Sequence, residues 1–173
     1  LQSFSLNKNI SIMDGLYSFL EILELTNVKC TFFIVANLVN KYEKIINEII
    51  KNGHEIACHS LNHELPLSQK PNIFKNDLIK AKKIIEDKFS IRINGYRAPC
   101  FNLNDDYLKI VEDINFVYDS SLIRSNLNDK YGFINKENFY KIENCIYKKN
   151  NFFEFEIPVL KKSLFNIPIS GTG

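Results

Sequence analysis

Residues 28–36, VKCTFFIVA, decide the fold class of this chain. Nearly all of them are β-branched, aromatic or otherwise apolar, without the regular apolar–polar alternation of a strand that has one face in water. An unalternating run of this kind is typical of a strand that is buried on both faces, as in a parallel sheet. The stretch therefore predicts a strand inside an α/β fold.

Helices and strands alternate on both sides of this stretch. Apolar residues at helical spacing predict four helices, over about 14–27, 38–51, 72–89 and 104–114. Asp14 and Asn104 are suitable N-caps for the first and the last of them. Short apolar runs predict three further strands, at 54–59, 91–96 and 116–118. This order implies parallel strands with helices packed outside them.

The pattern breaks after residue 122. Residues 123–151 are rich in Asn and Lys and predict loop with short strands, and 152–160 (FFEFEIPVL) predicts another strand. We find no internal repeat and no domain linker, so we expect one domain over residues 1–173. The start at Leu1 rather than Met, and the ending at Gly173, lead us to expect that both ends of the domain are missing.

Composition limits the classes of function. A length of 173 residues is short for an eight-stranded α/β barrel, which needs roughly 200 or more. The net charge of +2, with acids and bases interspersed, gives no reason to expect a nucleic-acid partner. No apolar run is long enough for a transmembrane segment. The four cysteines are scattered, and Cys30 is expected to be a buried thiol. The compartment, cytoplasm or cell envelope, stays open.

All three histidines fall within residues 53–63, GHEIACHSLNH. His59 and His63 have H-x-x-x-H spacing at the end of a predicted strand, where a turn would bring both rings to one side. Two neutral imidazoles suit zinc and also Co, Ni or Fe. The alternative is two loop histidines that only form hydrogen bonds. His54 lies at the start of the strand, away from this edge, and is expected to be a hydrogen-bonded structural residue.

Two further polar clusters occupy equivalent positions. Residues 97–100 (RAPC) and 119–121 (DSS) each begin where a predicted strand ends, as do residues 59–63. In parallel α/β folds the carboxyl ends of the strands form the edge at which sites are built. The sequence therefore predicts one site made from three successive strand ends.

The motifs together resemble the polysaccharide deacetylases of the NodB-homology type, carbohydrate esterase family 4. The matching pieces, in the family's order, are CTFFIVA (30–36), GHEIACHSLNH (53–63), GYRAPCF (95–101) and FVYDSSL (116–122). The resemblance covers about residues 28–122. It implies a distorted and here incomplete (β/α) barrel.

The resemblance also implies a function and a site. It implies hydrolytic N-deacetylation of an N-acetylated glycan by a divalent metal, usually zinc, for which His59 and His63 match the histidine ligands. Arg97 matches an arginine that orients the catalytic aspartate. The backbone N–H of Cys100 matches a group that stabilises the oxyanion, and Asp119 matches a residue that supports the charge network of the site.

Two departures from the family's pattern leave alternatives open. The family's first motif carries an Asp-Asp pair, but residues 3–7 (SFSLN) contain no carboxylate, and no histidine follows His63 to serve as the acid. Asp14 is a conceivable substitute ligand, although a helix cap is the simpler interpretation. Either the ends of the domain are missing, or the protein is an inactive carbohydrate-binding relative that keeps the metal-site histidines. Another amide hydrolysis, such as deformylation of a sugar, is a third hypothesis.

Overall fold

The computed structural model describes residues 12–125, 127–162 and 165–168. Four α-helices lie in this part of the chain: α1 (Ile12–Leu25), α2 (Glu43–Lys51), α3 (Pro71–Phe89) and α4 (Asp105–Asp113). The first four strands are β1 (Thr31–Ile34), β2 (Glu55–Cys58), β3 (Gly95–Tyr96) and β4 (Tyr118–Asp119). The others are β5 (Tyr140–Glu143), β6 (Ile146–Lys149), β7 (Phe152–Phe155), β8 (Val159–Lys162) and β9 (Phe165–Pro168).

The main sheet has the order β1-β2-β3-β4-β7-β6-β5. Pairing is parallel from β1 to β7 and antiparallel between β7, β6 and β5. The hairpin β8-β9 forms a separate two-stranded sheet. Because the four leading strands are parallel and adjacent, their carboxyl ends meet along one edge, as the sequence predicted.

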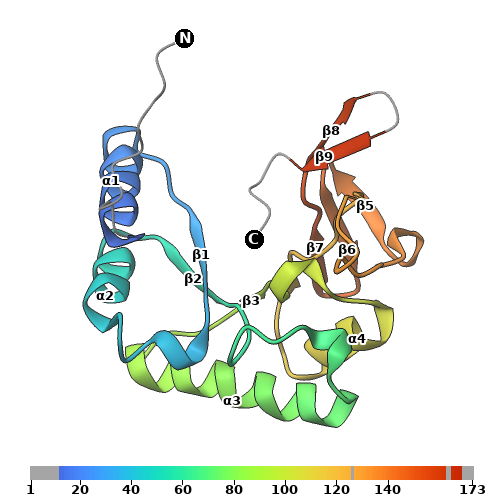
Figure 1. Cartoon of the computed structure of the whole chain (residues 1–173), viewed down its shortest axis with the longest axis horizontal. Helices are drawn as coiled ribbons and strands as arrows, with labels where there is room; N and C mark the ends of the chain where they lie inside the picture. Colours follow the sequence, from blue (N-terminus) through green and yellow to red (C-terminus); the bar gives the residue numbers. More distant parts are fainter. Residues whose placement is uncertain (1–11, 126, 163–164, 169–173) are drawn as a thin grey trace.

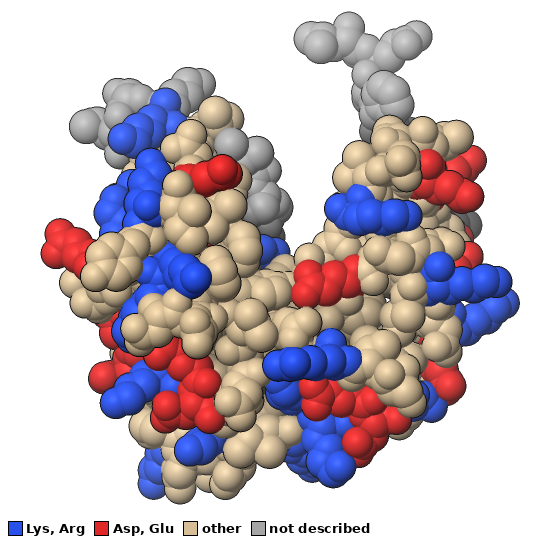
Figure 2. Space-filling model, turned by 180° about the vertical axis from the view of Figure 1, so that it is seen from behind, with Lys and Arg blue, Asp and Glu red and all other residues tan. Residues whose placement is uncertain are grey.

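The sheet is curved, with the helices on its outside, and the strands that the structure describes do not close into a barrel (Figure 1). Figure 2 shows a wide notch between the arm that carries α1 and the arm that carries β8 and β9. The predicted fold class, a distorted and incomplete (β/α) barrel, is confirmed. No helix in the described part of the chain has the length and apolar character that a membrane span needs.

The core lies between the sheet and the helices. The helix α3 buries Phe74, Leu78, Ala81 and Ile85, which belong to the apolar stripe that the sequence predicted. Burial of one such aliphatic side chain contributes about 1.5–3 kcal/mol. The helix stripe fixes α3 beneath the strands and so holds the strand ends in place.

Some predictions about the N-terminal half were wrong. The strand β1 is half-buried at each position instead of fully buried, because among the described strands it pairs with β2 alone and lies at the edge of the sheet. Asp14 is not an N-cap: α1 already begins at Ile12, and Asp14 lies inside its first turn. Asn104 is the N-cap of α4, and its side chain accepts a hydrogen bond from the backbone N–H of Tyr107.

Several predicted elements are shorter in the structure. A 3₁₀-helix (Ala36–Leu38) precedes α2, because the N–H groups of Ala36 and Asn37 bond the loop at 60–61. The strand predicted over 91–96 is reduced to Gly95–Tyr96, since the N–H of Ile93 bonds Glu86 on α3. The strand predicted over 152–160 divides into β7 and β8 around Pro158, which has no N–H for sheet pairing.

Candidate functional site

The ends of β2 and β3 form one wall of a pocket of about 320 Å³. His59 directly follows β2 and Arg97 directly follows β3. The pocket is lined by residues of β1 and of the segments that follow β2 and β3: Thr31, Phe32, Phe33, His59, His63, Arg97, Ala98, Cys100 and Phe101. The fold thus brings four of the five predicted site residues together.

His59 is held in one tautomer. Its Nδ1–H donates to the backbone carbonyl oxygen of Arg97 over 2.7 Å, because a carbonyl oxygen can only accept. The other ring nitrogen, Nε2, therefore keeps its lone pair. Burial, with a smaller contribution from the neighbouring His63 and Arg97, lowers the pKa of His59 to about 4, against the hydrogen bond to Arg97, which raises it. The imidazole is accordingly neutral at neutral pH, the form that binds metals.

His63 is exposed and lies beside His59. The two ring centroids are 4.9 Å apart, with the ring planes at 71°. His63 has a left-handed backbone conformation (φ 63°), and its N–H donates to Ser60 Oγ over 2.7 Å. This turn brings the second ring of the H-x-x-x-H pair back toward the first.

Arg97 connects the pocket to the next strand end. Its Nε donates to the carbonyl oxygen of Ser120 over 3.0 Å, and its Nη2 donates to Ser120 Oγ over 2.7 Å. The guanidinium carbon lies 4.1 Å from the ring centroid of Phe33. Burial lowers the pKa of Arg97, and the negative field of Asp119 opposes that shift. The pKa of a guanidinium is so high that Arg97 remains a fixed positive charge.

Cys100 and Asp119 occupy different surroundings. Cys100 lines the pocket in a left-handed conformation (φ 52°) within a short 3₁₀ turn. Asp119 is fully buried and does not line the pocket. Its carboxylate accepts hydrogen bonds from the N–H and the Oγ–H of Ser121, over 2.6 and 2.8 Å. The oxyanion role of Cys100 and the charge-network role of Asp119 stay predictions.

A second cavity, of about 400 Å³, lies on the same concave face of the sheet. It is lined by Cys30, Thr31, Phe33, Glu55, Arg97, Tyr118, Ser120 and Phe155, and it shares Thr31, Phe33 and Arg97 with the histidine pocket. Cys30 is half-buried and lines this cavity, so the prediction of a buried thiol was wrong; it directly precedes β1, which lies at the edge of the sheet that the described strands form.

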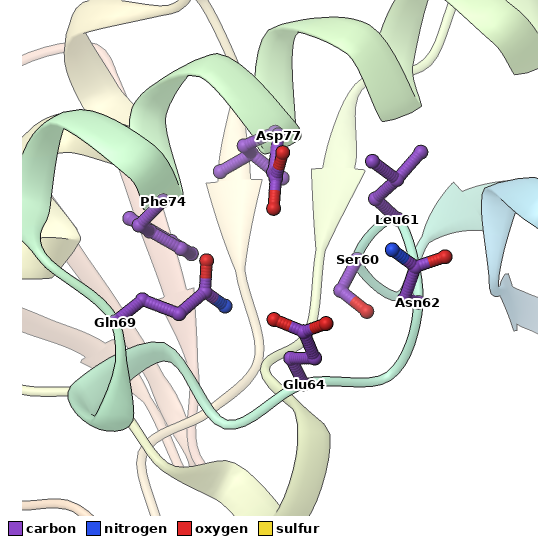
Figure 3. A pocket seen from close by; sticks show the side chains of 8 residues that line it. Ser60, Leu61, Asn62, Glu64, Gln69, Phe74 and Asp77 are labelled. Atoms are coloured by element: carbon purple, nitrogen blue, oxygen red, sulfur yellow. The ribbon is translucent and has the colours of Figure 1, made fainter.

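The loop that carries His63 also borders a third cavity, which is too small for a sugar. Its volume is about 10 Å³. Figure 3 shows Glu64 from the loop, Asp77 from α3 and the amide of Gln69 pointing into it. We therefore place no substrate there.

His54 lies apart from the pocket, as expected. It is 8% exposed, its Nδ1 accepts a hydrogen bond from the N–H of Cys30 over 3.4 Å, and its ring lies 5.5 Å from that of Phe32. The structure therefore places it in the hydrogen-bonded setting that the sequence suggested.

The site fits half of a zinc shell. His59 and His63 offer two imidazole nitrogens on one side of the pocket, a donor set that zinc favours. Among the residues that the structure describes, no group of three His, Cys, Asp or Glu side chains is arranged to hold a metal. Residues 3–7, where the family's carboxylates are expected, lie outside the described residues. Asp14 belongs to the first turn of α1 and does not line the histidine pocket.

Sequence reasoning gave no role to two residues that shape this region. Phe33 stacks on Arg97, beside Ser120 of the predicted 119–121 cluster, and Glu154 on β7 lies next to Asp119 in the sheet. The alternation of Thr31 and Phe33 along β1 could have indicated a pocket-facing pair. No local signal pointed to Glu154, because its partner is 35 residues earlier in the chain.

Comparison with known proteins agrees with this fold. Residues 14–118, more than half of the chain, match the model of the polysaccharide deacetylases. The chain belongs to the polysaccharide deacetylase family.

Individual relatives are distant. A peptidoglycan deacetylase of Helicobacter pylori is 22% identical over 117 residues, which are 68% of this chain and 40% of that protein. A Mycobacterium smegmatis structure described as a polysaccharide deacetylase superposes with a TM-score of 0.65 at 23% identity, over 92% of this chain and 52% of that one. A family 4 pseudoenzyme from Bacillus anthracis superposes with a TM-score of 0.55 at 23% identity, over 69% and 37%. The chain spans less than half the length of the first curated relatives that it matches.

Proposed function

We propose that this chain carries the metal-binding half of an enzyme that removes the N-acetyl group from an amino sugar in a glycan by metal-dependent hydrolysis. The observation that supports this most is the pair of adjacent imidazoles facing a pocket of about 320 Å³. Family membership, which rests on residues 14–118, supports deacetylation as the reaction class.

The residues of the chain have distinct roles in this proposal. His59 and His63 hold the divalent metal, most simply zinc, with Co, Ni or Fe as alternatives. When bound, such a metal polarises the acetamide carbonyl and lowers the pKa of water. The bond from His59 Nδ1–H to the Arg97 carbonyl orients the first ring.

Arg97 and Cys100 complete the wall of the pocket. The Arg97 guanidinium places a fixed positive charge beside the substrate carbonyl or beside a carboxylate that acts as base. The turn at Cys100 brings its backbone to the pocket, where the N–H is proposed to stabilise the oxyanion.

A second candidate is a carbohydrate-binding relative without catalysis. The specific observation in its favour is that the described residues supply no carboxylate at the histidine pair. Such a protein keeps a zinc ion and a glycan site but releases no acetate.

Metal content tests the ligand assignment. We expect the full chain to bind one zinc ion per molecule, and His59→Ala and His63→Ala each to lower the stoichiometry to near zero. His54→Ala is the matched control, because it removes an imidazole that lies five residues before His59 and nine before His63 but outside the pocket. Elemental analysis after dialysis against a weak chelator measures the ratio. Unchanged zinc in both pocket variants would overturn the assignment.

Acetate release separates the two candidates. The zinc-loaded chain is incubated with N-acetylglucosamine oligomers and, separately, with N-formyl analogues, and the freed acid is measured. Acetate that disappears in His59→Ala supports the enzyme. Retained zinc with oligomer binding and no acid supports the binding relative, and formate alone supports deformylation.

A further inference from the structure

We propose that Glu154 is a positioning residue for this site: it shares one proton with Asp119, and the pair, acting through Ser121, fixes the loop that orients His59. The inference concerns the same site as the proposed deacetylation and rests on it for its functional meaning. Glu154 lies on β7, beyond the segment that matches the family model.

The two carboxyl groups are neighbours by the register of the sheet. Asp119 on β4 and Glu154 on β7 are direct partners in a parallel pair, which places their side chains on the same face. Their chain neighbours Tyr118, Ser120 and Phe155 line the concave cavity, so Asp119 and Glu154 point to the opposite, helix-covered face. Both are fully buried.

One oxygen of the pair requires the proton. Glu154 Oε1 accepts from the N–H of Leu122 over 2.9 Å, and both oxygens of Asp119 accept from Ser121. Glu154 Oε2 is buried, and no described residue donates a hydrogen bond to it. A proton on either carboxyl group lets it donate to the other, which satisfies that oxygen and removes one of two adjacent buried negative charges.

The surroundings agree with a shared proton. Burial, with repulsion from Asp119 second, raises the pKa of Glu154 well above its ordinary value. Burial likewise raises the pKa of Asp119 to about 6, although hydrogen bonds from Ser121 and the Arg97 charge oppose the shift. The charge of Arg97 acts on both carboxyl groups, but its hydrogen bonds go to Ser120, and neither carboxyl group forms a salt bridge with any described residue.

The other ionisable groups near the pair do not neutralise it. The phenol of Tyr96, on β3, is buried. On β6, Tyr147 is the register partner of Glu154, but its hydroxyl donates to Glu156 Oε2 over 2.7 Å. Helix α4, packed over β4, buries apolar side chains here. We therefore infer that a shared proton removes one of the two negative charges of the pair.

A short series of hydrogen bonds connects the pair to the metal site. Ser121 Oγ–H donates to Asp119, and the same oxygen accepts from the N–H of Ala98 over 2.8 Å. Ala98 follows Arg97, whose carbonyl oxygen accepts from His59. The position of that carbonyl, and with it the tautomer of His59, therefore depends on a carboxyl pair on the other face of the sheet.

Two spectroscopic measurements on the metal-free full chain test this inference. Infrared spectroscopy is expected to show a protonated, buried carboxyl group at pH 7. Glu154→Gln keeps a donor toward Asp119 without any proton to share, so the band disappears while the fold remains. Glu156→Gln is the matched control: Glu156 is a buried glutamate directly after the same strand, and the variant keeps the band.

Side-chain ¹⁵N NMR of the three histidines reports the positioning. The wild type and Glu154→Gln are expected to show His59 with its proton on Nδ1, whereas Glu154→Leu, which removes both hydrogen bonds, mixes the two tautomers. Asp119→Asn is the second variant if Glu154→Leu does not fold, and like Glu154→Gln it keeps the Nδ1 proton.

Absence of the carboxyl band in the wild type, its survival in Glu154→Gln, or an unchanged His59 signal in folded Glu154→Leu overturns the inference. Neither measurement uses zinc or substrate, so failure of the proposed function would appear separately, as absent zinc binding.

Discussion

The two faces of the sheet treat buried ionisable groups in opposite ways. On the concave face, burial keeps a base neutral: His59 loses its proton more readily than in water and presents Nε2 to the pocket. On the helix-covered face, burial keeps an acid neutral: Asp119 and Glu154 hold a proton that carboxyl groups lose in water. The same desolvation acts on both, and it disfavours whichever form is charged.

The two faces therefore have different roles: the concave face carries the proposed reactive groups, and the helix-covered face holds them in position. The concave face leaves a lone pair open toward a pocket, where a metal or substrate can reach it. On the helix-covered face, the carboxyl oxygens of Asp119 and Glu154 accept hydrogen bonds from Ser121 and Leu122, except Glu154 Oε2, for which the described residues offer no donor and which needs a proton. Residues from the two faces meet at the loop over 97–98. A change in geometry on one face is therefore expected to reach the other through this loop, and a change in charge through the field of Arg97.

The largest effect on the free energy of unfolding is expected from a substitution at Gly95, which lies against the ring of Tyr118. A Cβ on Gly95 would lie 2.0 Å from the ring of Tyr118, its register partner on β4. Because the ring must move away from packed neighbours, Gly95→Ala is expected to lower the free energy of unfolding by about 3 kcal/mol. Urea denaturation measures the loss.

Gly15→Ala is the matched control for that substitution. No atom lies within 4 Å of a Cβ built on Gly15 in α1. Alanine there is expected to add about 0.5–1 kcal/mol through helix propensity. Equal effects of the two substitutions would contradict the close packing described for β3 and β4.

The next effect is the pH dependence of stability that His59 causes. Its pKa is about 4 in the folded chain and 6.5 in the unfolded one, so between these values only the unfolded chain binds the proton. Stability is therefore lost as the pH falls through this range. Relative to His59→Gln, the metal-free wild type is expected to lose about 2 kcal/mol between pH 7 and pH 5.

For the carboxyl pair, we expect stability to change with pH in the opposite direction to that caused by His59. The pKa of both groups is raised, so the folded chain holds a proton that the unfolded chain releases. Stability from the pair is present at low pH and is lost as the pH rises through about 6 and above. Urea titrations of wild type and Glu154→Gln at pH 5, 6, 7 and 8 compare the two; parallel curves would refute the shared proton.

The sequence was most informative where the signal was local. The apolar stripe of α3, the cap at Asn104 and the three polar strand ends each depend on residues within one segment. The structure places the ends of β2 and β3 at one pocket and joins Arg97 to Ser120, but Asp119 does not line that pocket. The position of His63 beside His59 likewise followed from one short turn.

The misses share a different cause. Whether β1 is an edge strand, and whether Cys30 is open to a cavity, depend on how many strands pair beyond it, which no local pattern records. In the sequence, Glu154 is one charged residue in an apolar strand. Only the strand register shows that it lies beside Asp119. These features depend on pairing between strands that are far apart in the sequence, and local sequence patterns do not predict such pairing.

The smallest expected effect concerns Arg97, whose charge acts on both faces. Arg97→Lys keeps the charge but loses the two-point contact with Ser120 and the stacking on Phe33, so the free energy of unfolding is expected to fall by about 1 kcal/mol. Arg97→Met also removes the charge, which at present opposes the rise in the pKa of Asp119. The carboxyl band of the pair, followed by infrared titration, is therefore expected to persist to higher pH in Arg97→Met than in wild type, and to be unchanged in Arg97→Lys. A band that moves equally in both variants would mean that Arg97 acts on the pair through the loop geometry rather than through its charge.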